Sequence, residues 1–251
     1  MIEQTQEGGV LTMRLAHGKA SALDLELLQA ISRTLEDAEN DPQVRALVLT
    51  GTDGIFCAGV DLKRILDGGD EYAQRYIPLL DEVFEQLFVF PHPVVCATNG
   101  HSIAGGCILT LACDYKLMAT GRGRMGIPEM KVGVPFPCSA FEIVRFAVPK
   151  SQAQALYYLA ETVLPEEALA RGLVDELQAP EDLLARAQSV ASELAAIPVE
   201  SFQITKRMLR APAVETMRAN RSEYGRAILG RWAHQATYDH IREYLAQTLK
   251  K

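Results

Sequence analysis

Two consecutive glycines, Gly105 and Gly106, stand where a buried strand gives way to a short apolar helix. Glycine has no Cβ, so the backbone at such a junction can approach a ligand closely, and the first helical N–H groups have no partner within the helix. The helix dipole adds partial positive charge there, which suits an oxygen that becomes negative during a reaction. A tight turn that needs small residues for packing would look the same, so the pair alone leaves both interpretations open.

A second turn of small residues, Phe56-Cys-Ala-Gly-Val-Asp-Leu62, also leaves a strand. If the two turns face one cleft, a backbone N–H group from each can bind the same thioester oxygen. Two such donors stabilise an enolate, and loss of one donor typically lowers the rate by about 10²–10³-fold. The two turns together therefore indicate a possible oxyanion hole.

Glu129 is the candidate acid/base, because it lies in the apolar segment Met125-Gly-Ile-Pro-Glu-Met130. Apolar neighbours raise the pKa of a carboxyl group towards the range that is useful for a general base. A surface glutamate at the end of a strand is the alternative interpretation. Two other carboxylates, Asp61 and Asp114, fit hydrogen-bond acceptors at a turn and at a helix end better than they fit bases.

Histidines and cysteines show no pattern typical of a metal site or of a nucleophile. His101 lies within the glycine motif, but no serine–histidine–aspartate or cysteine–histidine arrangement accompanies it, which favours a structural or pocket-lining role. We expect no bound metal. The cysteines have small apolar neighbours and no Cys-x-x-Cys pair, which indicates core thiols in a reducing compartment; they are Cys57, Cys96, Cys107, Cys113 and Cys138.

The formal net charge of -7 argues against a nucleic-acid-binding surface. An anionic ligand remains compatible with it, because Lys63, with Arg64 beside it, follows the second turn closely enough to reach a phosphate. A solvated surface pair is equally compatible with these two residues. The first residues resemble no signal peptide, and no apolar run approaches the roughly 20 residues of a membrane helix. We therefore expect a cytoplasmic protein without a membrane partner.

Hydropathy patterns predict strands and helices that alternate in the first part of the chain and helices in the last part. We expect strands at 10–16 (half-exposed), 44–50, 94–98, 115–119 and 174–177. We expect helices at 24–39, 70–90, from 105, at 165–172, 182–196, 202–209 and 214 to about 249. A helical tail of this length cannot bury its apolar side chains alone, which favours packing against partner subunits.

Three segments in this order, Phe56–Leu62, Asn99–Asp114 and Gly126–Met130, resemble the crotonase (enoyl-CoA hydratase/isomerase) family. Hydratases of that family carry a second glutamate where this chain has Ile108. The mitochondrial-type 3,2-enoyl-CoA isomerases are the most similar members, because they share the Ala-Gly-Gly-Cys run of residues 104–107 and an aliphatic residue at position 108. One carboxylate suits moving a proton along a substrate better than adding water to a double bond.

The resemblance implies an α/β fold, the crotonase spiral of β-β-α repeats, over residues 1–195. It implies a helical C-terminal region over residues 196–251 that builds homotrimers, often paired into homohexamers. The implied reaction shifts the double bond of a 3-enoyl-CoA to give the conjugated 2-enoyl-CoA. An enoyl-CoA hydratase, another crotonase reaction such as decarboxylation or thioester hydrolysis, and a non-catalytic acyl-CoA-binding subunit remain alternatives.

The resemblance also implies a role for particular residues. The backbone N–H groups of Val60 and Gly105 would form the oxyanion hole, and Glu129 would transfer the proton. Lys63 would contact a phosphate of coenzyme A, which enters as part of the substrate, with no other cofactor. The remaining residues expected to line the substrate are Lys19, Ala20, Ala22, Ala58, Gly106, Ile108 and Phe136.

Overall fold

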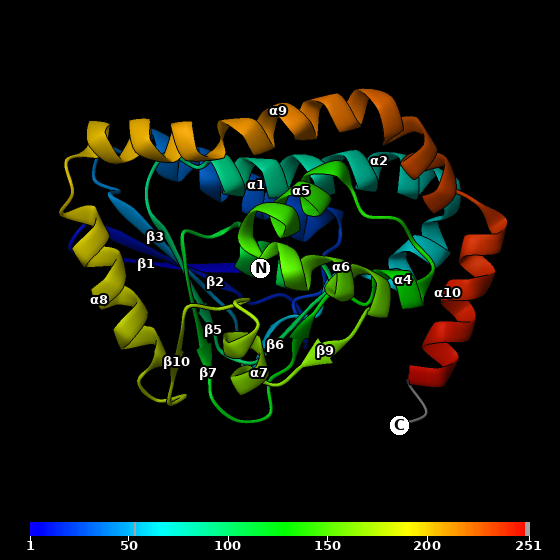
Figure 1. The fold of residues 1–251 in the computed structure, drawn as a ribbon, viewed down its shortest axis with the longest axis horizontal. Coiled ribbons are helices and arrows are strands. Elements are labelled where there is room, and N and C mark those ends of the chain that lie inside the picture. The colour runs from blue at the N-terminus through cyan, green and yellow to red at the C-terminus, as the bar shows by residue number, and fades with distance from the viewer. Residues whose placement is uncertain (53, 249–251) are drawn as a thin grey trace.

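The computed structural model describes residues 1–52 and 54–248, which form two sheets surrounded by helices (Figure 1). The strands are β1 (Ile2–Glu7), β2 (Val10–Leu15), β3 (Ala46–Thr50), β4 (Ile55–Cys57), β5 (Val94–Thr98), β6 (His101–Ile103), β7 (Tyr115–Ala119), β8 (Met125–Gly126), β9 (Thr162–Val163) and β10 (Glu176–Gln178). The helices are α1 (Leu25–Asn40), α2 (Leu62–Val89), α3 (Gly105–Ala112), α4 (Glu129–Val132), α5 (Cys138–Ala147), α6 (Lys150–Leu159), α7 (Pro165–Ala170), α8 (Leu183–Ala195), α9 (Val199–Trp232) and α10 (Gln235–Thr248).

The strands are distributed over the two sheets by a repeating rule. A six-stranded sheet has the order β1-β2-β3-β5-β7-β10, and a four-stranded sheet has the order β4-β6-β8-β9. Each of β3, β5 and β7 is followed by a strand of the smaller sheet and then by a helix, α2, α3 or α4. The chain thus repeats β-β-α units that each add one strand to both sheets, which confirms the predicted α/β spiral.

The larger sheet is covered on both faces. Leu11, Met13 and Leu15 of β2 belong to the main core under α1 and α2, whereas Val10 belongs to a second apolar cluster beneath α8. Along β2 only Arg14 is less than fully buried. Our prediction of a half-exposed strand at residues 10–16 was therefore wrong, because α8, far away in the sequence, packs on the face that we expected to be solvated.

Helix α2 begins at Leu62, eight residues before the predicted start at position 70. The Asp61 side chain caps it by accepting hydrogen bonds from the backbone N–H groups of Lys63 and Arg64, at 3.0 and 3.1 Å. Gly69 interrupts the helical geometry with a φ of 57°, so the segment consists of two helical parts joined at a kink. The apolar periodicity of the sequence predicted only the second of these two helical parts, after Gly69.

The C-terminal helices differ from the prediction in where they break. Helix α9 runs without interruption through Pro212, and the break falls at Ala233 and His234 instead of at residues 210–213. Proline disfavours a helix interior by about 3 kcal/mol, and here contacts of α9 with α2 and α5 outweigh that penalty (Figure 1). The predicted end of the last helix, near Leu249, lies outside the described residues.

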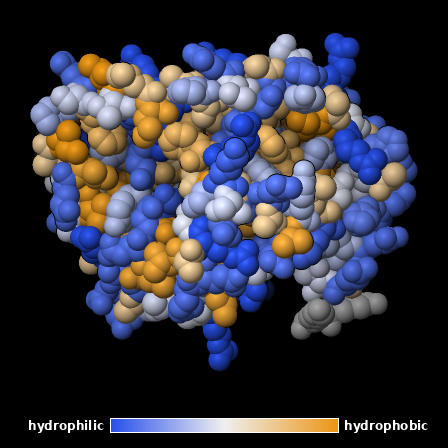
Figure 2. Space-filling view, in the orientation of Figure 1, coloured by the Kyte–Doolittle hydropathy of each residue, from blue (hydrophilic) through white to orange (hydrophobic). Residues whose placement is uncertain are grey.

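The surface alternates charged and apolar side chains. On the face shown in Figure 2, hydrophobic groups form separate patches between hydrophilic ones. Among the described residues, no helix is both long enough and apolar enough to cross a membrane. All five cysteines are free and buried, as predicted for core thiols.

Candidate active site

The smaller sheet brings the two small-residue turns together. Its strands β4 and β6 pair in parallel, with Cys57 opposite Ser102, so the turns that follow them leave the same edge of the sheet. A Cβ placed on Gly59 would lie 2.6 Å from the Ile103 carbonyl oxygen and 3.0 Å from the Gly105 backbone nitrogen. Only glycine fits at position 59, and its absent side chain lets the two turns touch.

Two backbone N–H groups are available at this contact. Gly105 is the first residue of α3, so its N–H has no acceptor within the helix. The described residues form many backbone hydrogen bonds in turns, loops and helix caps. Neither the Gly105 N–H nor the Val60 N–H is a donor in any of them. The preceding Ala104 has a φ of 52° and donates its own N–H to the Gly126 carbonyl at 2.8 Å. This left-handed residue turns the chain so that α3 begins at the junction with Gly59.

Glu129 reaches the same region from the next unit of the spiral. Strand β8 pairs in parallel with β6, with Ile103 opposite Gly126, and Glu129 opens the short helix α4 three residues later. Its side chain is buried, with a residue exposure of 7%. The alternative interpretation, a surface glutamate at a strand end, was therefore wrong.

Burial changes the chemistry of this carboxyl group. Desolvation raises the pKa of Glu129 from 4.5 to about 8, and the hydrogen bond with its own backbone N–H lowers it only in part. The Oε2 atom is buried and has no hydrogen-bond partner among the described residues. A buried, unpaired carboxyl oxygen with a pKa close to neutral is suited to accepting and returning a proton.

The surroundings of Glu129 are apolar. Its negative charge contributes to the raised pKa values of Cys107 and Tyr157, after the larger effect of their own burial, which places both side chains near it. Ile108 is fully buried on α3, and Phe136 packs edge-on against Tyr157 with ring centroids 5.1 Å apart. No second carboxylate stands at position 108 to share the work of Glu129.

An apolar cleft adjoins this region. It has a volume of about 570 Å³, and its lining includes Met130, Phe136, Phe141 and Tyr157. Met130 directly follows Glu129, and Phe136 also lines a neighbouring cleft of about 670 Å³ beside α9. The space beside Met130 and Phe136 is therefore suited to a hydrocarbon chain.

The competing carboxylates act as hydrogen-bond acceptors, as predicted. Asp61 caps α2. Asp114 accepts from the Val94 N–H at 2.8 Å and from two buried cations of α9. His101 accepts through Nδ1 from the Arg124 N–H at 3.3 Å, and the described residues contain no cluster of side chains that could hold a metal ion.

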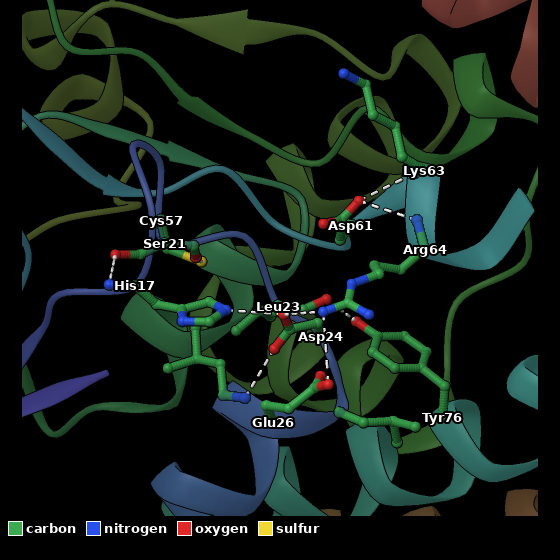
Figure 3. A network of polar contacts seen from close by, with 12 residues as sticks. His17, Ser21, Leu23, Asp24, Glu26, Cys57, Asp61, Lys63, Arg64 and Tyr76 are labelled. Atoms are coloured by element: carbon green, nitrogen blue, oxygen red, sulfur yellow. Dashed lines mark hydrogen bonds and ion pairs between the residues drawn. The ribbon is translucent and has the colours of Figure 1, made fainter. Parts of the chain in front are cut away.

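The loop before α1 lies beside the second turn. The Ala58 N–H donates to the Ala20 carbonyl at 3.0 Å, which joins the segment of Lys19, Ala20 and Ala22 to the second turn, Phe56–Leu62. Lys63 is exposed, and Figure 3 shows its side chain pointing away from the polar network below it. The neighbouring Arg64 forms an ion pair with Glu26, with 3.5 Å between Nη2 and Oε1.

Two residues of the site escaped the sequence analysis. Leu23 pairs with Val60 as a short parallel bridge, and Tyr76 donates its hydroxyl to the Leu23 carbonyl at 2.8 Å. Tyr76 contributed only to the apolar periodicity of α2, and Leu23 directly precedes the first helix. No motif distinguishes them from ordinary core residues.

The spiral of β-β-α units and the two facing turns define a protein of the crotonase fold class. The family model described as enoyl-CoA hydratase/isomerase matches residues 5–242. Enoyl-CoA delta isomerase 1, mitochondrial, of Mus musculus is 32% identical over 86% of this chain and 76% of its own length. A putative enoyl-CoA hydratase of Thermus thermophilus is 35% identical over 77% of each chain.

A solved structure shows the same fold over almost the entire length. The crystal structure of human mitochondrial delta3-delta2-enoyl-CoA isomerase is similar with a TM-score of 0.93 and 26% identity, over 99% of this chain and 98% of the other. The chain belongs to the enoyl-CoA hydratase/isomerase family, whose members act on acyl-CoA thioesters. Because its relatives carry both the isomerase and the hydratase name, membership leaves the reaction itself open.

Proposed function

We propose that the protein isomerises 3-enoyl-CoA thioesters to the conjugated 2-enoyl-CoA. The observation that carries this proposal is the single carboxyl group at the site. Of the three carboxylates near the motifs, Asp61 and Asp114 are occupied by hydrogen bonds, whereas Glu129 keeps a buried oxygen that has no partner within residues 1–52 and 54–248. The buried Ile108 supplies no second acid/base and helps exclude water.

In the proposed mechanism, the thioester oxygen accepts hydrogen bonds from the N–H groups of Val60 and Gly105. Glu129 removes a proton from the carbon next to the carbonyl, and the electron pair spreads over the oxygen and the former double bond as a dienolate. The two N–H donors stabilise the negative oxygen. Glu129 then returns the same proton to the γ carbon, so the double bond has moved into conjugation and no water is consumed.

The remaining predicted contacts hold the substrate. Lys63 binds a phosphate of coenzyme A, and the loop of Lys19, Ala20 and Ala22 lies along the pantetheine and adenine. The other residues proposed to contact the thioester or the acyl chain are Ala58, Gly106, Ile108 and Phe136. Coenzyme A arrives with the substrate, and the mechanism needs no further cofactor.

We propose a homotrimer, or a homohexamer of paired trimers, in a reducing compartment such as the cytoplasm. The outer face of α9 exposes Ile204, Met208 and Leu209, which supports contact with a second copy. The free buried cysteines support the reducing compartment.

Mixing the purified protein with a 3-enoyl-CoA tests the proposed reaction. We expect the ultraviolet absorbance of the conjugated thioester to rise. Loss of absorbance from added 2-enoyl-CoA would instead favour a hydratase, which the name of the Thermus thermophilus relative makes the second candidate. Release of carbon dioxide or free coenzyme A would favour another crotonase reaction, and tight binding without turnover would favour a binding subunit.

The raised pKa of Glu129 gives the isomerase a specific pH dependence. The ionised carboxylate is the active base, and its pKa of about 8 leaves it mostly protonated at neutral pH. We expect kcat/KM to rise about tenfold per pH unit up to about pH 8 and then to level off. Initial rates between about pH 6 and about pH 9.5 check this, and a flat profile would show that Glu129 is not the base.

A further inference from the structure

Leu23 fixes the direction of one proposed oxyanion donor through its backbone. Its N–H donates to the Gly59 carbonyl at 2.7 Å, and its carbonyl accepts from the Asp61 N–H at 2.9 Å. The Gly59 carbonyl and the Val60 N–H belong to the same planar trans peptide group and point in opposite directions. The hydrogen bond to the Gly59 carbonyl therefore directs the Val60 N–H away from Leu23. The hydrogen bond from the Asp61 N–H prevents the peptide between Val60 and Asp61 from rotating.

The Leu23 side chain reaches the other proposed donor. Leu23 is fully buried, and its Cδ1 atom lies 2.7 Å from the position that a Cβ on Gly105 would take. Phe84 Cζ lies 3.3 Å from the same position. Gly105 is thus packed against Leu23 and Phe84, and Leu23 contacts both turns of the proposed oxyanion hole.

Tyr76 holds Leu23 through the carbonyl that also accepts from Asp61. Its hydroxyl donates to the Leu23 carbonyl at 2.8 Å, from a fully buried position on α2. Burial raises the pKa of Tyr76 well above its usual value, so the hydroxyl keeps its proton. Figure 3 shows Leu23 and Asp24 between the loop of His17 and Ser21 and the turn of Asp61.

We infer that Leu23, held by the Tyr76 hydroxyl, positions the N–H donors of Val60 and Gly105 at the spacing that one thioester oxygen requires. This inference rests on the proposed function, because it assigns a role to residues behind the proposed oxyanion hole. Leu23 and Tyr76 are positioning residues, since both are fully buried and act through their bonds to the two turns. The Leu23 carbonyl accepts from both Tyr76 and Asp61, so loss of the tyrosine hydroxyl weakens the arrangement and leaves one bond in place.

The test measures how strongly the site polarises a thioester. The carbonyl stretching frequency of a carbon-13-labelled 2-enoyl-CoA is recorded by infrared difference spectroscopy, free and bound to the complete protein. We expect the wild type to lower the frequency and Tyr76→Phe to lower it distinctly less. We also expect Tyr76→Phe to reduce kcat at least about 10-fold with KM changed less than about twofold, since a displacement of about 1 Å can cost about 10²-fold in rate.

Tyr72→Phe is the matched control. Tyr72 lies one helical turn earlier on α2, stacks on Tyr76 with ring centroids 5.6 Å apart, and accepts at its hydroxyl from the Leu25 N–H at 3.1 Å. Its loss removes a partly buried hydroxyl from the same helix and leaves the hydrogen bonds of Leu23 in place. We expect it to leave the carbonyl frequency and kcat close to the wild-type values. Equal effects of the two substitutions would reduce Tyr76 to a general packing role and overturn the inference.

Leu23→Val is the second variant, for use if Tyr76→Phe does not fold. It keeps the backbone bonds and removes the Cδ atoms that touch Gly105, so we expect it to weaken carbonyl polarisation as well. A folded Leu23→Val or Tyr76→Phe protein that polarises the carbonyl as fully as the wild type would overturn the inference. If the wild type itself leaves the bound carbonyl frequency unchanged, the oxyanion hole of the proposed function is refuted instead.

Discussion

Replacing Glu129 with glutamine is expected to reduce kcat for the isomerisation of a 3-enoyl-CoA by about 10²–10⁴-fold. Glutamine has nearly the same shape as glutamate but cannot accept and return a proton. The site offers no substitute, because Ile108 occupies the position where a second carboxylate would stand. The rise of conjugated-thioester absorbance, measured at saturating substrate, checks this prediction.

The same substitution is expected to stabilise the protein at alkaline pH. The pKa of Glu129 is raised from 4.5 to about 8 in the folded state, so between these values the folded chain keeps a proton that the unfolded chain releases. The free energy of unfolding therefore falls as the pH rises through this range. The Glu129→Gln variant has no carboxyl group to titrate, so its free energy of unfolding does not fall in this way. Its melting temperature should exceed that of the wild type above pH 8, and the two melting temperatures should become similar near pH 4.5.

Glu36→Gln is a suitable control, because Glu36 is exposed on α1 and the same chemical change there should alter neither rate nor stability. The opposite directions of the two expected effects separate a catalytic role from a structural one. A structural glutamate would lose stability and activity together on substitution. A Glu129→Gln protein that keeps more than about a tenth of the wild-type kcat would refute Glu129 as the acid/base.

The features that were predictable from the sequence are those with local causes. Glycines at a strand-to-helix junction and an apolar period of three to four residues act within a few residues of one another. For this reason helix α1 and five strands of the larger sheet, β2, β3, β5, β7 and β10, were predicted close to their observed bounds, whereas β1 was not predicted. The motif segments also identified the family, since their order and spacing are preserved along the chain.

The smaller sheet was not predictable in the same way. Its strands β4 and β6 are three residues long, too short to show an alternating pattern, and they pair across more than forty residues of intervening chain. That pairing is what brings Gly59 against Gly105. The site therefore depends on contacts between distant segments that hydropathy does not report.

The burial of Glu129 has a similar origin. Its sequence neighbours are apolar, but the side chains that surround the carboxyl group also come from other elements, including Cys107 on α3 and Tyr157 on α6. Leu23 and Tyr76 illustrate the same limit. Each has the residue type of an ordinary core position, and only the bonds on either side of Val60 distinguish them.

Asp114 provides the largest expected effect on stability. Its Oδ2 atom accepts from Lys206 at 2.6 Å and its Oδ1 atom from Arg210 at 2.7 Å, so one carboxylate pairs with two cations of α9. Both cations are buried, with side-chain exposures of 6% and 5%. Arg210 also lies over the Phe88 ring at 4.2 Å, which fixes α9 against the end of α2.

Replacing Asp114 with alanine is expected to lower the free energy of unfolding by about 3–5 kcal/mol, because it leaves two buried cations without their counter-charge. Burial already lowers the pKa of Lys206 to about 8, and Asp114 is the main group that opposes this shift. Loss of Asp114 should therefore favour neutral Lys206 and loosen the contact of α9 with the core. Urea unfolding of the variant and the wild type measures the difference.

Lys206→Met provides the comparison that isolates the ion pair. Methionine fills a similar volume without a charge, so this variant should lose much less stability than Asp114→Ala. The double variant Asp114→Ala with Lys206→Met should be more stable than the sum of the single losses implies, since one of the two unpaired cations is gone. Strict additivity would contradict this, because it would mean that Asp114 stabilises α9 through the Val94 N–H and Arg210 alone.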